Sequence, residues 1–112
     1  MIVAIIGSRG LEISDFGEYL PKETKTIVSG GAKGIDTCAR RYAQENGLGI
    51  VEILPDYEKY GRAAPLKRNI EIIKQADLVL AFWDGKSKGT KFVIDNSKKM
   101  NKEIIVVQMD SD

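Results

Sequence analysis

Residues 26–36 read "TIVSGGAKGID" and join a short apolar run, a glycine-rich loop and the beginning of a helical pattern. The first three residues are β-branched, which is typical of a buried strand. Gly30, Gly31 and Gly34 then permit positive φ angles and a close approach of the backbone to a ligand. Asp36 stands where the helical pattern begins. The segment therefore predicts a strand–loop–helix unit of an α/β protein.

The same alternation continues along the chain in both directions. Short runs rich in Ile and Val predict strands at residues 2–6, 26–28, 50–54, 78–82 and 104–108. Helical periodicity lies between them, weakly at residues 11–20, then from Gly34 to near Gly47, from near Pro65 onward, and at residues 90–100. Residues 55–69 are expected to form a long irregular connection.

This order of elements predicts the α/β class. We expect a single Rossmann-like, three-layer domain over residues 1–112, with a parallel five-stranded sheet covered by helices on both faces. The strands are short and continuous in their apolar character, as in sheets that are buried on both sides. On the third helix, Leu66, Ile70 and Ile73 are expected to form the buried stripe.

The composition excludes several classes of protein. Of the 112 residues, 43% are hydrophobic and 29% are charged, which is typical of a soluble globular protein. The net charge of +1 gives no electrostatic reason for tight nucleic-acid binding, and no apolar run is long enough to span a membrane. The chain has no histidine, so the usual general base is absent. Because Cys38 is the only cysteine, no disulfide framework exists, and a cytoplasmic location is expected.

Three strand-to-helix loops carry unusual chemistry. They are "GSRG" at residues 7–10, "SGGAKGID" at residues 29–36 and "DGKSKGT" at residues 84–90. In a parallel sheet these loops meet at one edge, where glycine-rich backbone and helix N-termini favour a phosphate. Each loop alone could be a simple turn, and Asp36 and Thr90 could be simple helix caps. Three such loops at one edge favour a phosphate-bearing ligand over that structural explanation.

The segment before and within the third helix adds further candidates. Arg68 offers a planar fork for a phosphate, and Asn69 could pair with a ribose or a base edge, although a solvated helix face is the plain alternative. Tyr57 and Tyr60 could stack on a base, but surface tyrosines without a ligand are common.

These motifs together resemble the SLOG superfamily, and most closely its small YspA-like, cpYpsA-related branch. The resemblance rests on "GSRG", "VSGGAKGID", "YGRAAPLKRN" and "ADLVLAFWDGKSKGT", and it spans essentially the whole chain in the right order. It implies a Rossmann-like fold that binds nucleotides or nucleotide-derived ligands, including NAD-like and ADP-ribose-like molecules, as a sensor or carrier. The DNA-processing protein A proteins share a similar pattern of Gly-Ser-Arg, Ser-Gly-x-Ala-x-Gly-Ile-Asp and a later Arg-Asn.

The resemblance also implies which residues form the ligand site. The implied ligand-binding residues are Gly7, Ser8, Arg9, Ser29, Gly30, Gly31, Gly34, Asp36, Arg68, Asn69, Gly85, Ser87, Gly89 and Thr90. Asp84, at the beginning of the third loop, is expected to lie in the same site. No metal site is recognised in the sequence, but the ligand phosphate could bring a Mg²⁺ ion that lies near Asp84. A homodimer is expected from the small size of the chain and from the habits of the family.

Two other functions stay open at this stage. The first is a phosphoribohydrolase that cleaves the N-glycosidic bond of a nucleoside monophosphate, with Asp36 or Asp84 as the catalytic candidate and Arg9 or Arg68 on the phosphate. LOG-type enzymes carry Pro-Gly-Gly-x-Gly-Thr-x-x-Glu, whereas here Val93 stands at the glutamate position, so no catalytic residue is assigned firmly.

The second is binding of single-stranded DNA, for which basic residues and the two tyrosines could form a platform. The basic residues considered are Arg40, Arg41, Arg62, Lys67 and Arg68. The near-neutral net charge makes nucleic acid the least expected partner.

Overall fold

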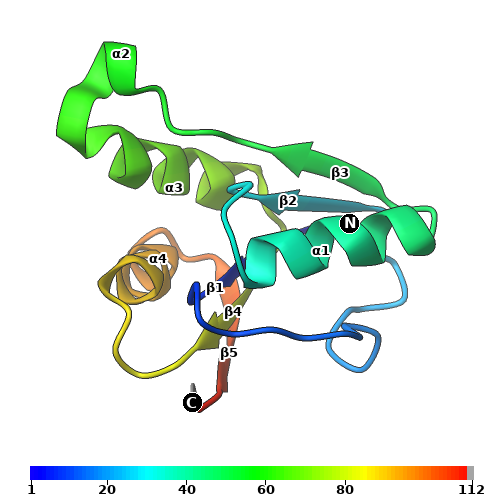
Figure 1. Ribbon diagram of the computed structural model, residues 1–112. Coiled ribbons are helices and arrows are strands. Elements are labelled where there is room, and N and C mark those ends of the chain that lie inside the picture. Colours follow the sequence, from blue (N-terminus) through cyan, green and yellow to red (C-terminus); the bar gives the residue numbers. More distant parts are fainter. Residues whose placement is uncertain (111–112) are drawn as a thin grey trace.

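Residues 1–110 are described by a computed structural model (Figure 1). The strands are β1 (Ile2–Gly7), β2 (Thr26–Ser29), β3 (Gly49–Glu52), β4 (Leu78–Trp83) and β5 (Glu103–Gln108). The helices are α1 (Ile35–Glu45), α2 (Tyr57–Tyr60), α3 (Ala64–Gln75) and α4 (Lys88–Lys99), with a 3-10 turn, η1 (Gly61–Ala63), between α2 and α3.

The strands form one five-stranded sheet in the order β3-β2-β1-β4-β5, and all neighbouring strands are parallel. In the middle of the sheet, Ala4 of β1 lies opposite Val28 of β2 and Val79 of β4. The chain first moves from β1 to one edge and then returns to start β4 beside β1. Such a reversal opens a crevice between the loops that follow the two central strands. The predicted parallel α/β architecture is confirmed.

Two buried clusters cover the two faces of the sheet. On one face, α1 and the segment after β1 pack with Phe16, Ile35 and Phe82 at the centre. On the other face, α3 and α4 contribute Ile72, Ile73 and Val93. The aromatic rings of Phe16 and Phe82 meet edge to face at a centroid distance of 5.4 Å. Helices therefore cover both faces, as the sequence predicts (Figure 1).

The predicted helix at residues 11–20 is wrong. This segment has only isolated turns, although Leu11 and Phe16 are buried as expected of apolar anchors. The side chain of Asp15 accepts a hydrogen bond from the backbone N–H of Gly17 at 2.7 Å. Such a local side-chain turn competes with helical hydrogen bonds, and glycine in the middle lowers the helix propensity further.

Residues 55–69 also differ from the expected irregular connection, because most of them are helical. Asp56 caps α2 by accepting a hydrogen bond from the N–H of Lys59, and Gly61 ends it at a φ of 57°. Helix α3 then begins at Ala64, with proline in its first turn, close to the predicted start at Pro65.

Burial differs from expectation at the sheet edges and on α3. The side chains of the edge strands β3 and β5 are only partly buried, and within residues 1–110 each of these strands has a neighbour on one side alone. On α3, Leu66 is 44% exposed, whereas Ile72 and Ile73 are fully buried. The buried stripe is thus shifted toward the C-terminal half of the helix, where α3 crosses the sheet.

We predict that Phe16→Ala lowers the free energy of unfolding by about 3–5 kcal/mol, because a large aromatic side chain is lost from a fully buried site. Tyr57→Ala is the matched control, since Tyr57 is 60% exposed, and it should cost about 1 kcal/mol or less. Urea denaturation of both variants measures the difference. Equal losses in the two variants would contradict the assignment of Phe16 as a core anchor of residues 11–20.

Candidate functional site

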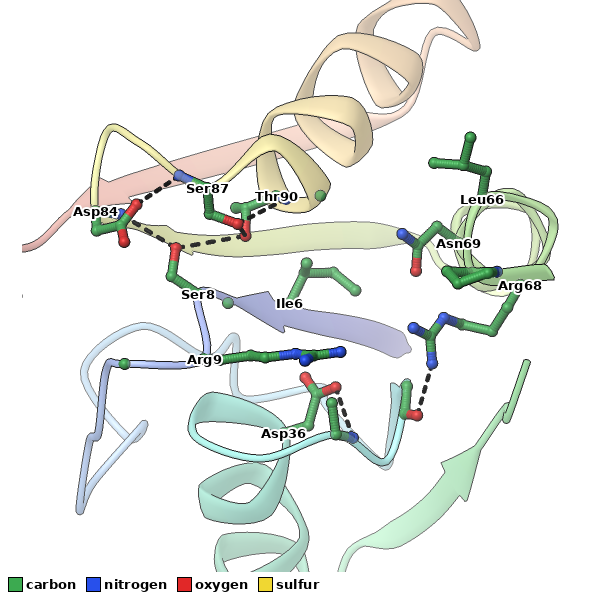
Figure 2. A pocket seen from close by; sticks show the side chains of 16 residues that line it. Ile6, Ser8, Arg9, Asp36, Leu66, Arg68, Asn69, Asp84, Ser87 and Thr90 are labelled. Carbon is green, nitrogen blue, oxygen red and sulfur yellow. Dashed lines mark hydrogen bonds between the residues drawn. The ribbon is translucent and has the colours of Figure 1, made fainter. Parts of the chain in front are cut away.

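A cavity of about 460 Å³ opens at the carboxyl edge of the sheet, between the loops after β1, β2 and β4 and the beginning of α3 (Figure 2). It lies at the point where the strand order reverses, which is where parallel α/β proteins bind ligands. Its lining residues are Ile6, Gly7, Ser8, Arg9, Gly10, Gly30, Ala32, Asp36, Pro65, Leu66, Arg68, Asn69, Asp84, Ser87, Gly89 and Thr90.

Most of the residues that the sequence indicates are brought together in this cavity. Those that line it are Gly7, Ser8, Arg9, Gly30, Asp36, Arg68, Asn69, Asp84, Ser87, Gly89 and Thr90. They come from all three glycine-rich loops and from α3. The three loops that are far apart in sequence therefore do meet at one edge of the sheet.

Four of the expected residues do not line the cavity. Ser29 is fully buried at the end of β2. Gly31, Gly34 and Gly85 have positive φ angles and support the loops instead. A Cβ atom at Gly34 would lie 2.4 Å from the backbone oxygen of Arg9, so this glycine lets the first two loops pack closely. These four residues support the loops that form the cavity walls but do not line the cavity themselves.

Sequence reasoning missed five lining residues, which are Ile6, Gly10, Ala32, Pro65 and Leu66. Pro65 and Leu66 lie in the first turn of α3 and give one side of the cavity an apolar surface. The sequence signal was an apolar residue directly after the proline at the start of the helix, but the spacing of Leu66 matched a buried helix stripe equally well. Only the position of α3 over the sheet decides between the two.

Three helix N-termini surround the cavity. Asp36 lies in the first turn of α1, Leu66 in that of α3, and Thr90 in that of α4. The N-terminus of a helix carries a partial positive charge and free backbone N–H groups. Their convergence makes the cavity favourable for an anion.

Two arginines add full positive charges. Figure 2 shows the exposed side chain of Arg9 extending across the cavity from the β1 loop toward Arg68 on α3. The pKa of Arg68 is lowered, chiefly by its burial and to a smaller extent by the charge of Arg9, while Asp36 and Tyr57 oppose the shift. The two guanidinium groups therefore lie close enough to repel each other.

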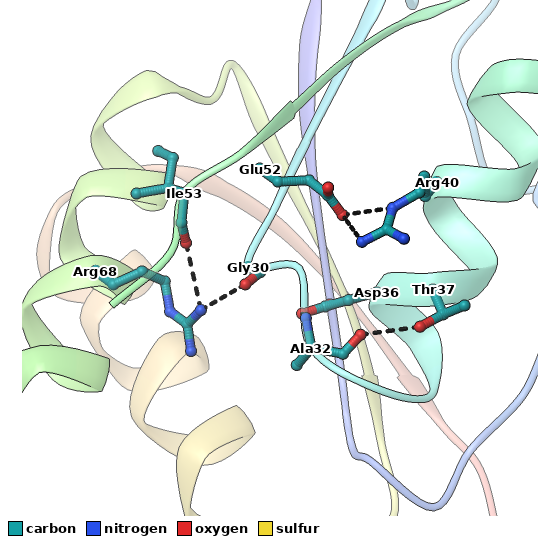
Figure 3. A network of polar contacts seen from close by, with 8 residues as sticks. All are labelled: Gly30, Ala32, Asp36, Thr37, Arg40, Glu52, Ile53 and Arg68. Carbon is teal, nitrogen blue, oxygen red and sulfur yellow. Dashed lines mark hydrogen bonds and ion pairs between the residues drawn. The ribbon is translucent and has the colours of Figure 1, made fainter. Parts of the chain in front are cut away.

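Arg68 also holds the site together. Its Nη1 donates hydrogen bonds to the carbonyl oxygens of Gly30 at 2.7 Å and Ile53 at 3.3 Å (Figure 3). These contacts join α3 to the loop after β2 and to the end of β3. The alternative of a solvated helix face therefore does not hold for Arg68, because its side chain turns toward the sheet edge and lines the cavity.

The loop after β2 is fixed by α1. Its Ala32 N–H donates to a carboxylate oxygen of Asp36 at 3.1 Å, and its Ala32 carbonyl accepts from the Thr37 hydroxyl at 3.0 Å (Figure 3). Beside it, Arg40 donates two hydrogen bonds to Glu52 at 2.7 and 2.9 Å. The N-cap position of α1 is Gly34, so Asp36 is not the cap residue.

The two carboxylates of the cavity have opposite pKa shifts. Burial raises the pKa of Asp36, although the Ala32 N–H and Arg68 partly offset this effect. The pKa of Asp84 is lowered, because its Oδ1 accepts hydrogen bonds from the N–H groups of Ser87 and Lys86, both at 2.8 Å. Asp84 is thus an ionised loop-forming acceptor, and Asp36 is the carboxyl group that is more easily protonated.

A cluster of hydroxyl groups joins the loops after β1 and β4 (Figure 2). Ser87 is the N-cap of α4, and its hydroxyl group donates to the hydroxyl oxygen of Thr90 at 3.2 Å. The hydroxyl oxygens of Thr90 and Ser8 are 3.5 Å apart, and Ser8 also accepts from the N–H of Asp84 at 3.3 Å. Thr90 is therefore not the helix cap but part of the cavity wall.

Residues 1–110 contain no cluster of three or more His, Cys, Asp or Glu side chains that could hold a metal ion. Within the same range, no helix is both long and apolar enough to cross a membrane.

The fold and the cavity at the switch point define a Rossmann-like α/β protein with a polar, anion-favouring site. Over residues 1–111 the chain matches the family model described as DNA recombination-mediator protein A, and it belongs to that family. This match confirms the predicted relation to the DNA-processing protein A branch of the SLOG superfamily. Comparisons with curated proteins and with solved structures gave no match.

We predict that Asp36→Asn stabilises the protein at neutral pH relative to the unmodified chain. A carboxyl group whose pKa is raised on folding opposes folding once it is ionised, so stability falls as the pH rises above the ordinary Asp range. Asparagine can still accept from the Ala32 N–H but carries no charge to bury. Urea denaturation near pH 3 and pH 7 measures this, and the gain should be present only at the higher pH. If the stability difference between the variant and the unmodified chain is equal at the two pH values, or larger near pH 3, the raised pKa of Asp36 is contradicted.

Proposed function

We propose that this chain binds a small ligand of the nucleotide class, with a phosphate and a ribose, in the cavity at the carboxyl edge of its sheet. The observation that carries the proposal is the convergence of three helix N-termini and two arginines on one cavity. Its volume, about 460 Å³, lies in the range of small-molecule sites.

The phosphate would lie between the arginines and the beginning of α4. Arg9 and Arg68 face the same space, and an anion between them would relieve their repulsion. Gly89 leaves the first turn of α4 open, since no heavy atom lies within 4 Å of a Cβ built there. The hydroxyl groups of Ser87 and Thr90 add neutral donors on the same side.

The ribose would lie near Asp36. A carboxylate is a poor neighbour for a phosphate but a good acceptor for sugar hydroxyl groups, as in other Rossmann-like sites. Asp36 lines the cavity beside Gly30, and Asn69 can contribute both a donor and an acceptor. A ligand with both an anionic and a hydroxyl-bearing end therefore fits better than a free anion.

Binding is favoured over turnover by the position that would hold the hydrolase glutamate. Val93 of α4 occupies that position and is fully buried in the core, so no carboxylate stands there. Asp95 lies on the surface and pairs with Lys91 at 2.8 Å. Asp36 is the remaining candidate for acid–base chemistry, because burial raises its pKa.

We predict a saturable rise in melting temperature with AMP, ADP-ribose or NAD, and a weaker response to dAMP and to inorganic phosphate. Ligand that binds only the folded state stabilises it by about 2.7 kcal/mol at a hundredfold excess over Kd. Arg9→Gln should weaken binding about 10- to 100-fold, as expected for the loss of a charge-assisted hydrogen bond. Calorimetric titration gives the affinities.

Arg41→Gln is the matched control, because Arg41 is exposed on α1 and does not line the cavity. It should leave the affinity unchanged. If neither AMP, ADP-ribose nor NAD produces a saturable rise in melting temperature, the proposal is wrong. Release of free base or ribose 5-phosphate during the titration would show that the site also turns the ligand over.

A second candidate is binding of single-stranded DNA, and the family description favours it. The same cavity would then hold one phosphate of a strand, with Pro65 and Leu66 as an apolar surface beside a sugar or base.

For this candidate we predict that a 12-nucleotide DNA binds more tightly than dAMP, and that its affinity falls steeply between about 50 and 200 mM salt. Fluorescence anisotropy with the unmodified chain, Arg9→Gln and Arg41→Gln measures both effects. If the oligonucleotide binds no better than dAMP, the small-ligand function is favoured.

A further inference from the structure

Strand β5 is an edge strand whose four middle residues lack the features that usually protect such edges. Its sequence is EIIVVQ, and residues 104–107 contain no lysine, proline or glycine. Its only neighbouring strand within residues 1–110 is β4. The opposite edge, β3, differs: it has four residues, begins with Gly49, and ends at Glu52, which pairs with Arg40. Each edge strand thus has one terminal glutamate, but β5 has a longer uninterrupted apolar edge than β3.

The backbone of β5 presents a row of free groups at regular spacing. The N–H of Met109 donates to the carbonyl of Trp83 on β4 at 2.8 Å. The backbone N–H and C=O groups of successive residues in a strand point to opposite sides within the plane of the sheet. Those of Ile105 and Val107 therefore also point toward β4. The N–H and C=O groups of Ile104, Val106 and Gln108 therefore point away from the sheet.

We propose that a second copy of this chain docks on β5 in antiparallel orientation, with Val106 of the two copies opposite each other at a twofold axis. This register places Ile104 opposite Gln108, so all three outward-facing residues of each strand find partners. A shift by two residues in either direction leaves at least one of them unpaired. The two sheets become one continuous ten-stranded sheet, which is within the usual size of open sheets.

The charges at the two ends of β5 agree with this arrangement. Antiparallel pairing in this register places Glu103 opposite Met109 and Lys102 opposite Asp110, so no like charges face each other. A parallel pairing in register would place Glu103 opposite Glu103, which is unfavourable. The strand is thus self-complementary only in the orientation that a twofold axis allows.

Apolar side chains on both faces of β5 would become covered. Ile105 is 42% exposed and Val106 is 41% exposed. In the proposed register Ile105 lies opposite Val107, and Val106 lies opposite its own copy. The cavity is lined by no residue of β5, so this inference does not rest on the proposed ligand.

Sedimentation analysis of the full chain over about 1–500 µM tests the proposal. We expect a concentration-dependent dimer for the unmodified chain, and at least a tenfold weaker dimer for Val106→Lys, which places two lysines opposite each other at the axis. Val51→Lys is the matched control on β3, since Val51 is 42% exposed and also lies on an edge strand. Melting curves establish that both variants fold.

A cross-linking experiment tests the same geometry without a charge. Opposed residues that exchange hydrogen bonds lie about 5.5 Å apart between Cα atoms, so two cysteines placed there are within reach of a short bifunctional thiol reagent. With such a reagent Val106→Cys should form a covalent dimer much faster than Val51→Cys, and the native Cys38 is buried. A chain that is monomeric throughout, a dimer that survives Val106→Lys, or equal cross-linking of the two cysteine variants would overturn the proposal.

Discussion

The hydrogen bonds from Arg68 Nη1 to the carbonyl oxygens of Gly30 and Ile53 join α3 to the ends of β2 and β3, which the hydrogen bonds of the sheet already hold side by side. They fix the beginning of α3 against the loop after β2 and the end of β3. The buried side chains of Ala64, Ile72 and Ile73 hold α3 on the sheet, and the Arg68 hydrogen bonds add a polar tether near its N-terminal end. The cavity depends on this tether, because one of its walls is the first turn of α3.

The site combines charges that oppose one another. Two arginines and three helix N-termini face two aspartates across one small cavity. Asp84 is held ionised by two backbone N–H groups of its own loop, whereas burial raises the pKa of Asp36. The arrangement suits a ligand that is anionic at one end and rich in hydroxyl groups at the other. A buried carboxyl group with a raised pKa that lines a cavity is a common feature of binding and catalytic sites.

Much of the fold and of the site follows from local patterns. Continuous apolar runs predicted all five strands, and glycines at strand ends predicted the loops that meet at the cavity. The patterns failed at residues 11–20, where Asp15 and Gly17 form a turn within an apolar spacing that suits a helix equally well. They failed again at Leu66, since exposed and buried positions of an amphipathic helix cannot be assigned before its neighbours are known.

The sequence by itself determined the alternation of strands and helices, the positions of the flexible glycines and the absence of histidine from any mechanism. These are properties of single residues and of their spacing. Only the tertiary structure decided that Arg68 turns toward the sheet, that Gly31, Gly34 and Gly85 support the walls rather than line them, and that β5 lies at an edge of the sheet. These features depend on contacts between segments that are distant in the chain, and on strand order, which local sequence patterns do not specify.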